Sequence, residues 1–158
     1  MKSPFVETMC AALVCLGLSE AVHAIDYSFT NIVGKTSGAF TVPGLGGFNN
    51  AGTVVFDGRL HGVPGIFTGS GGPVTTVYET NGSFSSFFAA TINDSGSVAF
   101  NASLDAGGEG IFTGNGGLVT TIADTGDGLS FFSAPSINNS GTVAFSAFDS
   151  AGGAIFYR

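Results

Sequence analysis

The residues most able to do chemistry are three side chains in one short stretch, Asp57-Gly58-Arg59-Leu60-His61-Gly62. A carboxylate, a guanidinium and an imidazole are groups that a hydrolytic site uses. The stretch offers no positioned nucleophile and no oxyanion donor, and a hydrolase needs both. Similar stretches at residues 101–107 and 146–152 have the sequence of plain strand and turn. We therefore predict a surface loop, assign no catalytic residue and expect the protein not to be an enzyme.

Carboxylates in glycine-rich turns suggest a second chemistry, the binding of Ca²⁺ through oxygen ligands. These carboxylates belong to Asp94, Asp105, Glu109, Asp124, Asp127 and Asp149. The run Asp124-Thr125-Gly126-Asp127-Gly128 comes nearest to alternating oxygen donors, but it is shorter than the 12-residue calcium loop and lacks the closing Glu. A turn without metal is the better interpretation, so we assign no metal ligand and no cofactor-binding residue.

Aromatic side chains form a third candidate. They are Phe84, Phe87, Phe88, Phe131 and Phe132, with Tyr78 just upstream. Sugar-binding platforms favour amphipathic aromatic rings, and this chain has no Trp and three Tyr. Phenylalanines that recur in phase are more typical of a core. A glycan- or calcium-binding lectin-like domain, with one site in each repeated unit, is kept as the alternative function.

All of these residues lie on a sequence that repeats. The segment Ile137–Phe145 has a near copy at Ile92–Phe100 and a looser one at Phe48–Phe56. A Gly-Ile-Phe block follows at Gly65 and Gly110, and Ala154 begins a third version of it. Both blocks recur every 44 or 45 residues, which is a period typical of propeller blades or stacked units.

The repeated octapeptides are NNAGTVVF from Asn49, NDSGSVAF from Asn93 and NNSGTVAF from Asn138. They resemble the bacterial tandem-repeat family named for its Asn-x-x-Gly-x-x-Ala-Phe motif, with Val55 replacing Ala in the first copy. The resemblance implies an exported, surface-associated or secreted protein without an established activity. It carries over no catalytic residue.

Each unit is expected to contain four short antiparallel strands, because apolar and β-branched runs alternate with Asn- and Gly-rich turns. Three of these strands are expected at residues 97–102, 110–113 and 118–123, and the fourth and least regular element at residues 83–89 and 129–134. Residues 129–134 are followed by Pro135, which, like Pro43, suits an edge strand or a loop.

The predicted fold is therefore all-β, with about three repeats of 44–45 residues that each form a four-stranded, propeller-like blade. Known propellers have roughly four blades or more. The blades are thus either open or completed by dimerisation, and a threefold β-prism or β-trefoil is the alternative. Residues 25–40 match the second half of a repeat, with Ile32-Val33 aligned to Val77, and residues 154–158 begin a further half. These complementary ends and the missing polar cap predict self-association.

The N-terminus has the pattern of a secretory signal peptide over residues 1–24. Lys2 precedes an apolar run from Met9 to Leu18, and Val22-His23-Ala24 provides small residues for cleavage. Cys10 and Cys15 both lie in this segment. The mature chain, residues 25–158, is then one β-repeat domain without cysteine and without a membrane span.

The charge of the mature chain excludes one class of partner, because the chain has three cationic and nine acidic side chains. Three cations cannot form the basic stripe that nucleic-acid binding requires. The sequence therefore favours a non-enzymatic exported protein, extracellular or in the cell envelope, that acts as a surface scaffold or interaction module. Its expected partners are a second copy, a cell-surface protein or a polysaccharide.

Overall fold

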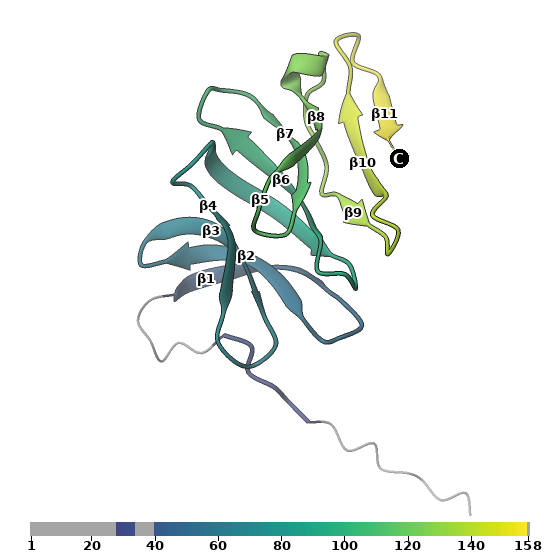
Figure 1. The fold of residues 1–158 in the computed structure, drawn as a ribbon. Helices are drawn as coiled ribbons and strands as arrows, with labels where there is room; N and C mark the ends of the chain where they lie inside the picture. Colours follow the sequence, from purple (N-terminus) through teal and green to yellow (C-terminus); the bar gives the residue numbers. More distant parts are fainter. Residues whose placement is uncertain (1–27, 34–39, 158) are drawn as a thin grey trace, which may run out of the picture.

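The structure is a computed structural model that describes residues 28–33 and 40–157 (Figure 1). The predicted signal peptide, residues 1–24 with Cys10 and Cys15, lies outside the described residues. Within the described ranges the only helical element is a short 3₁₀ turn, η2 (Thr125–Asp127), and no helix there is long and apolar enough to cross a bilayer. The fold is all-β, as predicted.

In the part of the chain that the structure describes, eleven strands form three antiparallel sheets that follow one another in sequence. The first sheet has the order β1 (Phe40–Phe48), β2 (Val54–Leu60), β3 (Val63–Gly69) and β4 (Thr75–Glu79). The second has the order β5 (Phe84–Ile92), β6 (Val98–Leu104), β7 (Glu109–Gly114) and β8 (Thr120–Asp124). The third has the order β11 (Ala154–Tyr157), β10 (Val143–Phe148) and β9 (Ser136–Ile137).

The four strands expected in each unit are present in the first two sheets. The third sheet contains three strands, and its beginning is the least regular part of the fold. Ser130 forms an isolated bridge with Phe148, Phe131 takes a positive φ of 54°, and β9 has only two residues. Pro135 directly precedes β9, which is an edge strand, and Pro43 lies in the edge strand β1.

The repeated octapeptide makes the tight turn between the first two strands of each sheet. Its glycines, Gly52, Gly96 and Gly141, have φ of 75°, 82° and 82°. That left-handed conformation is readily adopted by Gly and disfavoured for residues with a Cβ, which explains why Gly recurs there. The period of the sequence is therefore the period of the sheets.

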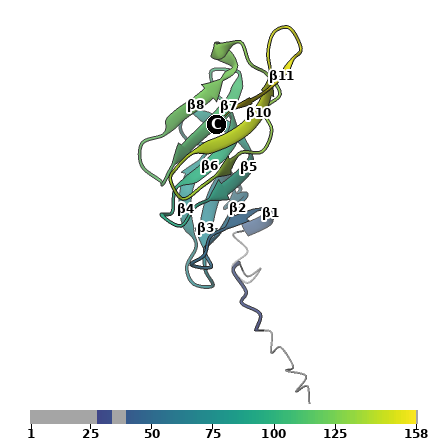
Figure 2. The same cartoon turned by 90° about the vertical axis from the view of Figure 1, so that its right-hand side faces the viewer.

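Neighbouring sheets pack face to face (Figures 1 and 2). Strand β5 lies across the face of β1, β2 and β3, and β9 lies against β5 and β6. The approach is close at Gly46 in β1, where a Cβ would stand 2.5 Å from the carbonyl oxygen of Val55 and 2.7 Å from that of Ala90. The backbones of β1 and β5 can lie this near only because Gly46 has no side chain.

Alternation along each strand gives every sheet two different faces. In the second sheet, the rings of Phe100 and Phe112 face the first sheet and belong to one core cluster. Ala99 and Ile111 directly precede these two residues in sequence, so they point to the opposite face. They face the third sheet and belong to a second cluster with Phe145. Each unit thus packs an aromatic face against the aliphatic face of the unit before it.

Candidate functional site

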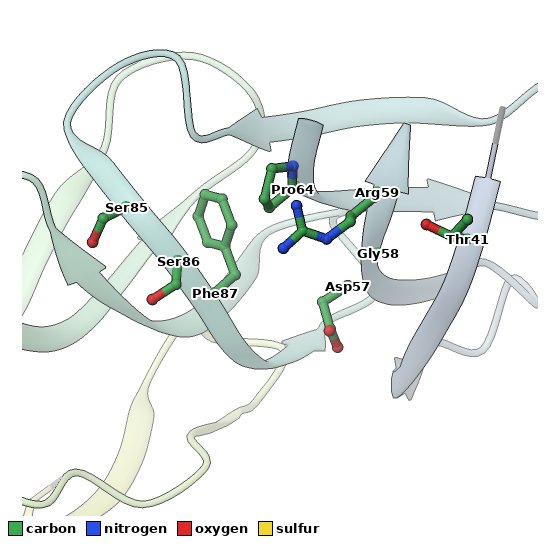
Figure 3. A pocket seen from close by; sticks show the side chains of 9 residues that line it. Thr41, Asp57, Gly58, Arg59, Pro64, Ser85, Ser86 and Phe87 are labelled. Carbon is green, nitrogen blue, oxygen red and sulfur yellow. The ribbon is translucent and has the colours of Figure 1, made fainter. Parts of the chain in front are cut away.

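The first sheet and β5 enclose a cleft of about 390 Å³ (Figure 3). It is lined by Thr41, Asp57, Gly58, Arg59, Pro64, Gly65, Ser85, Ser86 and Phe87. Two of the three residues singled out in the sequence therefore meet side chains from the next unit. The sequence did not predict this contact, because Ser85, Ser86 and Phe87 lie in β5, which belongs to the following repeat.

Strand geometry places Asp57 and Arg59 on one side of the first sheet. They alternate with Phe56 along β2 and share the face of Val55, which is buried in the core between the first and second sheets. Burial decreases along this face from Val55 through the half-buried Asp57 to the exposed Arg59. The cleft is thus the open margin of the interface between the two sheets.

Asp57 is the group in the cleft whose ionisation is perturbed. Partial burial raises the pKa of its carboxyl, and its own backbone N–H opposes the shift. The carboxyl lies over Gly44, its partner in the β1–β2 register, where a Cβ would stand 2.8 Å from Cγ of Asp57. A glycine at position 44 therefore makes room for this carboxylate.

Arg59 holds the neighbouring turn. Its Nη1 donates a hydrogen bond to the carbonyl oxygen of Gly62 at 3.1 Å. In Figure 3 the guanidinium points toward Phe87 and Pro64, whereas the carboxylate of Asp57 points away from it. The guanidinium of Arg59 and the ring of Phe87 consequently face the cleft, whereas the hydroxyl groups of Ser85 and Ser86 point away from Arg59 (Figure 3).

His61 lies elsewhere, in the two-residue turn between β2 and β3. It is exposed, has φ of 52° and is followed by Gly62 with φ of 87°. Positive φ at both central residues is typical of a type I′ hairpin turn. The imidazole does not line the cleft, so Asp57, Arg59 and His61 are not assembled into one site.

The predicted calcium candidates Asp124 and Asp127 accept backbone hydrogen bonds around η2. Oδ1 of Asp124 accepts from the N–H of Gly126 at 2.7 Å, and Oδ2 of Asp127 accepts from the N–H of Asp124 at 3.0 Å. This reciprocal arrangement is a capping box. Among residues 28–33 and 40–157, no three carboxylate, imidazole or thiol groups gather as metal ligands would.

No family model, no curated protein and no solved structure matches the chain. The possible uses of the surface must therefore be inferred from its own residues and geometry.

A ladder of amide hydrogen bonds is the structural feature that the sequence did not predict. Nδ2 of Asn49 donates to the carbonyl oxygen of Asn93 at 3.2 Å, and Nδ2 of Asn93 donates to that of Asn138 at 3.0 Å. We call these three residues the asparagine ladder. Each Oδ1 meanwhile accepts backbone N–H groups of its own turn. The repeated Asn thus closes one turn and binds it to the next.

A second row of bonds runs beside the asparagine ladder, one residue further along each turn. Oδ1 of Asp94 accepts from the N–H of Asn50 at 2.9 Å, and Oδ2 of Asp94 accepts from Nδ2 of Asn139 at 2.7 Å. The bonds from the backbone and side chain of Asn50, with that from Asn139, hold the pKa of Asp94 below its ordinary value. Asp94 therefore connects the first and third units through the second.

The predicted aromatic cluster is divided between two cores and the surface. Tyr78 and Phe84 belong to the core between the first and second sheets, and Phe87 packs against it. Phe132 belongs to the core between the second and third sheets. Phe88 and Phe131 are exposed. Most of these rings are core residues, and they do not form a single platform.

The second interface differs from the first at the position equivalent to Asp57. That residue is Asn101, which is 5% exposed and donates from Nδ2 to the carbonyl oxygen of Phe132 at 2.9 Å. The space that is open beside Asp57 is therefore filled at Asn101. A lectin site repeated in every unit, the alternative drawn from the sequence, does not fit these two dissimilar positions.

Proposed function

We propose that the protein is a non-enzymatic, exported β-repeat protein that serves as a surface scaffold or interaction module. The observation that carries the proposal is the asparagine ladder: the polar groups of the repeated motif bond to their own turns and to neighbouring turns. Residues that recur for chemistry would direct such groups toward a ligand. Here they join units, which is what a scaffold requires.

The proposal includes the arrangement of the units. Three sheets with the same strand order, each packed face to face on the next, support propeller-like blades, with the turns of the asparagine ladder on one side of the stack. The motif resemblance to the bacterial exported repeat family supports the same architecture. A threefold β-prism or β-trefoil finds less support, because the two core clusters lie between successive sheets and neither is shared by all three sheets.

Export is tested by expressing the full chain in a bacterial host and fractionating the cells. We expect a chain that begins at Ile25 in the exported fraction, as shown by N-terminal sequencing. A full-length chain retaining residues 1–24 inside the cell would contradict the proposal.

The cleft supports a second candidate, the binding of one glycan chain per protein. Phe87 offers an aromatic ring, Arg59 and Asp57 offer a charged donor and an acceptor, and Ser85 and Ser86 contribute to the lining. Sugars are commonly held by such a mixture of ring and polar groups. Binding to a panel of bacterial polysaccharides should be lost in Arg59→Ala and kept in His61→Asn, a control in the adjacent exposed turn. Binding that survives Arg59→Ala would exclude this cleft.

A further inference from the structure

The outward face of the third sheet is exposed at a position that is covered in the other two units. Val55 in β2 and Ala99 in β6 are fully buried, each against the sheet that follows. The equivalent residue in β10 is Ala144, and it is exposed. Phe131 and Phe148 lie beside each other near this face and are also exposed. The third sheet thus presents an apolar face of the kind that its predecessors bury.

Apolar residues in and just before β8 are also more exposed than their equivalents in the first unit. In the first unit, Val74 and Val77 are partly buried, and Val77 lies beside Gly116 in the turn between β7 and β8. The equivalent residues of the second unit are Val119 and Ile122, and both are exposed. The equivalent turn of the third sheet would follow β11 and lead into a fourth strand, so an element added beside β11 would cover them as the β7–β8 turn covers Val77.

The first unit has the complementary surface. Phe48 ends β1 and is 77% exposed, whereas the equivalent residue of β5, Ile92, is 6% exposed and packs in the core between the first two sheets. Phe48 therefore projects where a preceding unit would receive it. An exposed aromatic at one end of the stack and an exposed apolar face at the other are the two halves of one interface.

Residues 28–33 show how such an interface begins. Ile32 lies beside Gly69 in the first unit, just as Tyr78 of β4 lies beside Gly114 in the second. The segment thus stands where the fourth strand of a preceding sheet would stand. By these contacts Ile32 is equivalent in position to Tyr78, whereas the sequence alignment placed Ile32-Val33 at Val77.

The asparagine ladder is also open at its end. Asn49 is 8% exposed and Asn93 is 4% exposed, because each is covered by the following turn, whereas Asn138 is exposed. Within the described residues, Nδ2 of Asn138 donates no hydrogen bond. In the described part of the chain, the ladder therefore ends at Asn138 with a donor that has no acceptor.

We infer that a second copy of this chain docks head-to-tail on the third unit and repeats the packing between the first and second units. Phe48 of the incoming copy covers the face of Ala144, and its Asn49 carbonyl accepts from Nδ2 of Asn138. Its residues 28–33 lie beside β11 as a fourth strand of the third sheet. Contacts of this heterologous kind close into a ring or extend as a filament, depending on the rotation per unit. This inference goes beyond the proposed function and is independent of export and of any ligand.

The test is the mass of the purified chain by light scattering across concentrations, with two variants at opposite ends. Ala144→Glu places a charge on the receiving face, and Phe48→Glu places one on the projecting end; both positions are exposed, so the monomer should fold. Ala106→Glu, in the exposed turn between β6 and β7, is the matched control. We expect a dimer or longer assembly for the wild type and the control, and a monomer for each end variant. A monomeric wild type, or assembly insensitive to both variants, would overturn the inference.

Mixing the two end variants distinguishes head-to-tail docking from a symmetric dimer. Ala144→Glu keeps an intact projecting end and Phe48→Glu keeps an intact receiving face, so their equimolar mixture should form a one-to-one heterodimer. A symmetric interface that uses the same patch on both copies would stay disrupted. A mixture that remains monomeric therefore refutes head-to-tail docking.

Discussion

The side-chain amide of Asn93 donates to the main-chain carbonyl oxygen of Asn138, 45 residues later, at 3.0 Å. Oδ1 of the same asparagine accepts the N–H of Ser97 at 2.9 Å inside its own turn. Asp149 performs only the second of these tasks, since its Oδ1 accepts from Ala151 and Gly153. An aspartate can close this type of turn, and an asparagine is needed to bond the turn to its neighbour.

Asn93→Asp should therefore destabilise the fold. The change removes the donor of the bond to Asn138 and puts a carboxylate against a carbonyl oxygen in a buried place. A lost buried bond of this kind costs about 1–3 kcal/mol. Urea denaturation should show this loss. Asn138→Asp should change the stability of the monomer little, because Nδ2 of Asn138 is exposed and donates no hydrogen bond to any described residue. Equal losses in the two variants would contradict the role of the asparagine ladder.

Acid should weaken the second row of bonds. Three hydrogen bonds hold the pKa of Asp94 below its ordinary value of 3.8, so its contribution to stability is fully present above that value. The contribution is lost as pH falls through the lower pKa of the folded state. Thermal melting between neutral pH and about pH 2 should decline less steeply in Asp94→Asn than in the wild type. Parallel curves for the two proteins would refute this.

Asp57 should have the opposite effect on the pH dependence. Burial raises the pKa of its carboxyl above the ordinary value of 3.8, so the charged form costs stability once pH rises through the folded-state pKa. Asp57→Asn, which copies Asn101 of the next unit, should be more favourable to stability at neutral pH than at a pH below that ordinary value. Melting curves at the two pH values measure the difference, and an effect larger in acid would be inconsistent with the shift.

Because β1 approaches β5 closely at Gly46, we expect this position not to tolerate a side chain. Gly46→Ala would put a methyl group 2.5 Å from the carbonyl oxygen of Val55, and overpacking of this kind costs about 1–3 kcal/mol. Gly72→Ala is the control, because a Cβ at Gly72 would meet nothing within 4 Å. Urea denaturation of both variants should show a loss at Gly46 alone.

The aromatic face of the second sheet should contribute strongly to stability. Phe100 is fully buried, and its ring centroid lies 5.1 Å from that of Tyr78 and 5.5 Å from that of Phe84. Phe100→Ala should cost about 3–5 kcal/mol. Phe88→Ala, at an exposed position on β5, should cost far less in the same denaturation experiment. A mild effect at Phe100 would mean that the two sheets do not pack as described.

Much of the fold could be predicted from the sequence, because turns and strands are local. Gly52, Gly96 and Gly141 show in the sequence where the chain must turn, and the apolar runs after them show the strands. The asparagine ladder could not be predicted in this way. The acceptor for Asn93 is a backbone carbonyl in another unit, and the sequence does not show how far apart two units stand.

The cleft shows the same limit. The sequence predicts a surface loop for this stretch, but Asp57 and Arg59 lie in β2 and share one face of it. Only His61 and Gly62 form a turn, and the positive φ at His61 carries its side chain out of the group. Phe87 joins the cleft only because β5 crosses the first sheet. A turn conformation and a crossing between sheets decided which residues meet, and neither is visible in the spacing of three residues.

Packing between consecutive sheets also bears on how the chain should unfold. Among the described strands, none of the first sheet pairs with one of the third, and each core cluster lies between two successive sheets. Such an array behaves as a row of coupled neighbours, in which an end member can open without disturbing the far end. The third unit, with a two-residue first strand and one packed face, should exchange its amide hydrogens first. The second unit, held on both faces, should protect its amides longest.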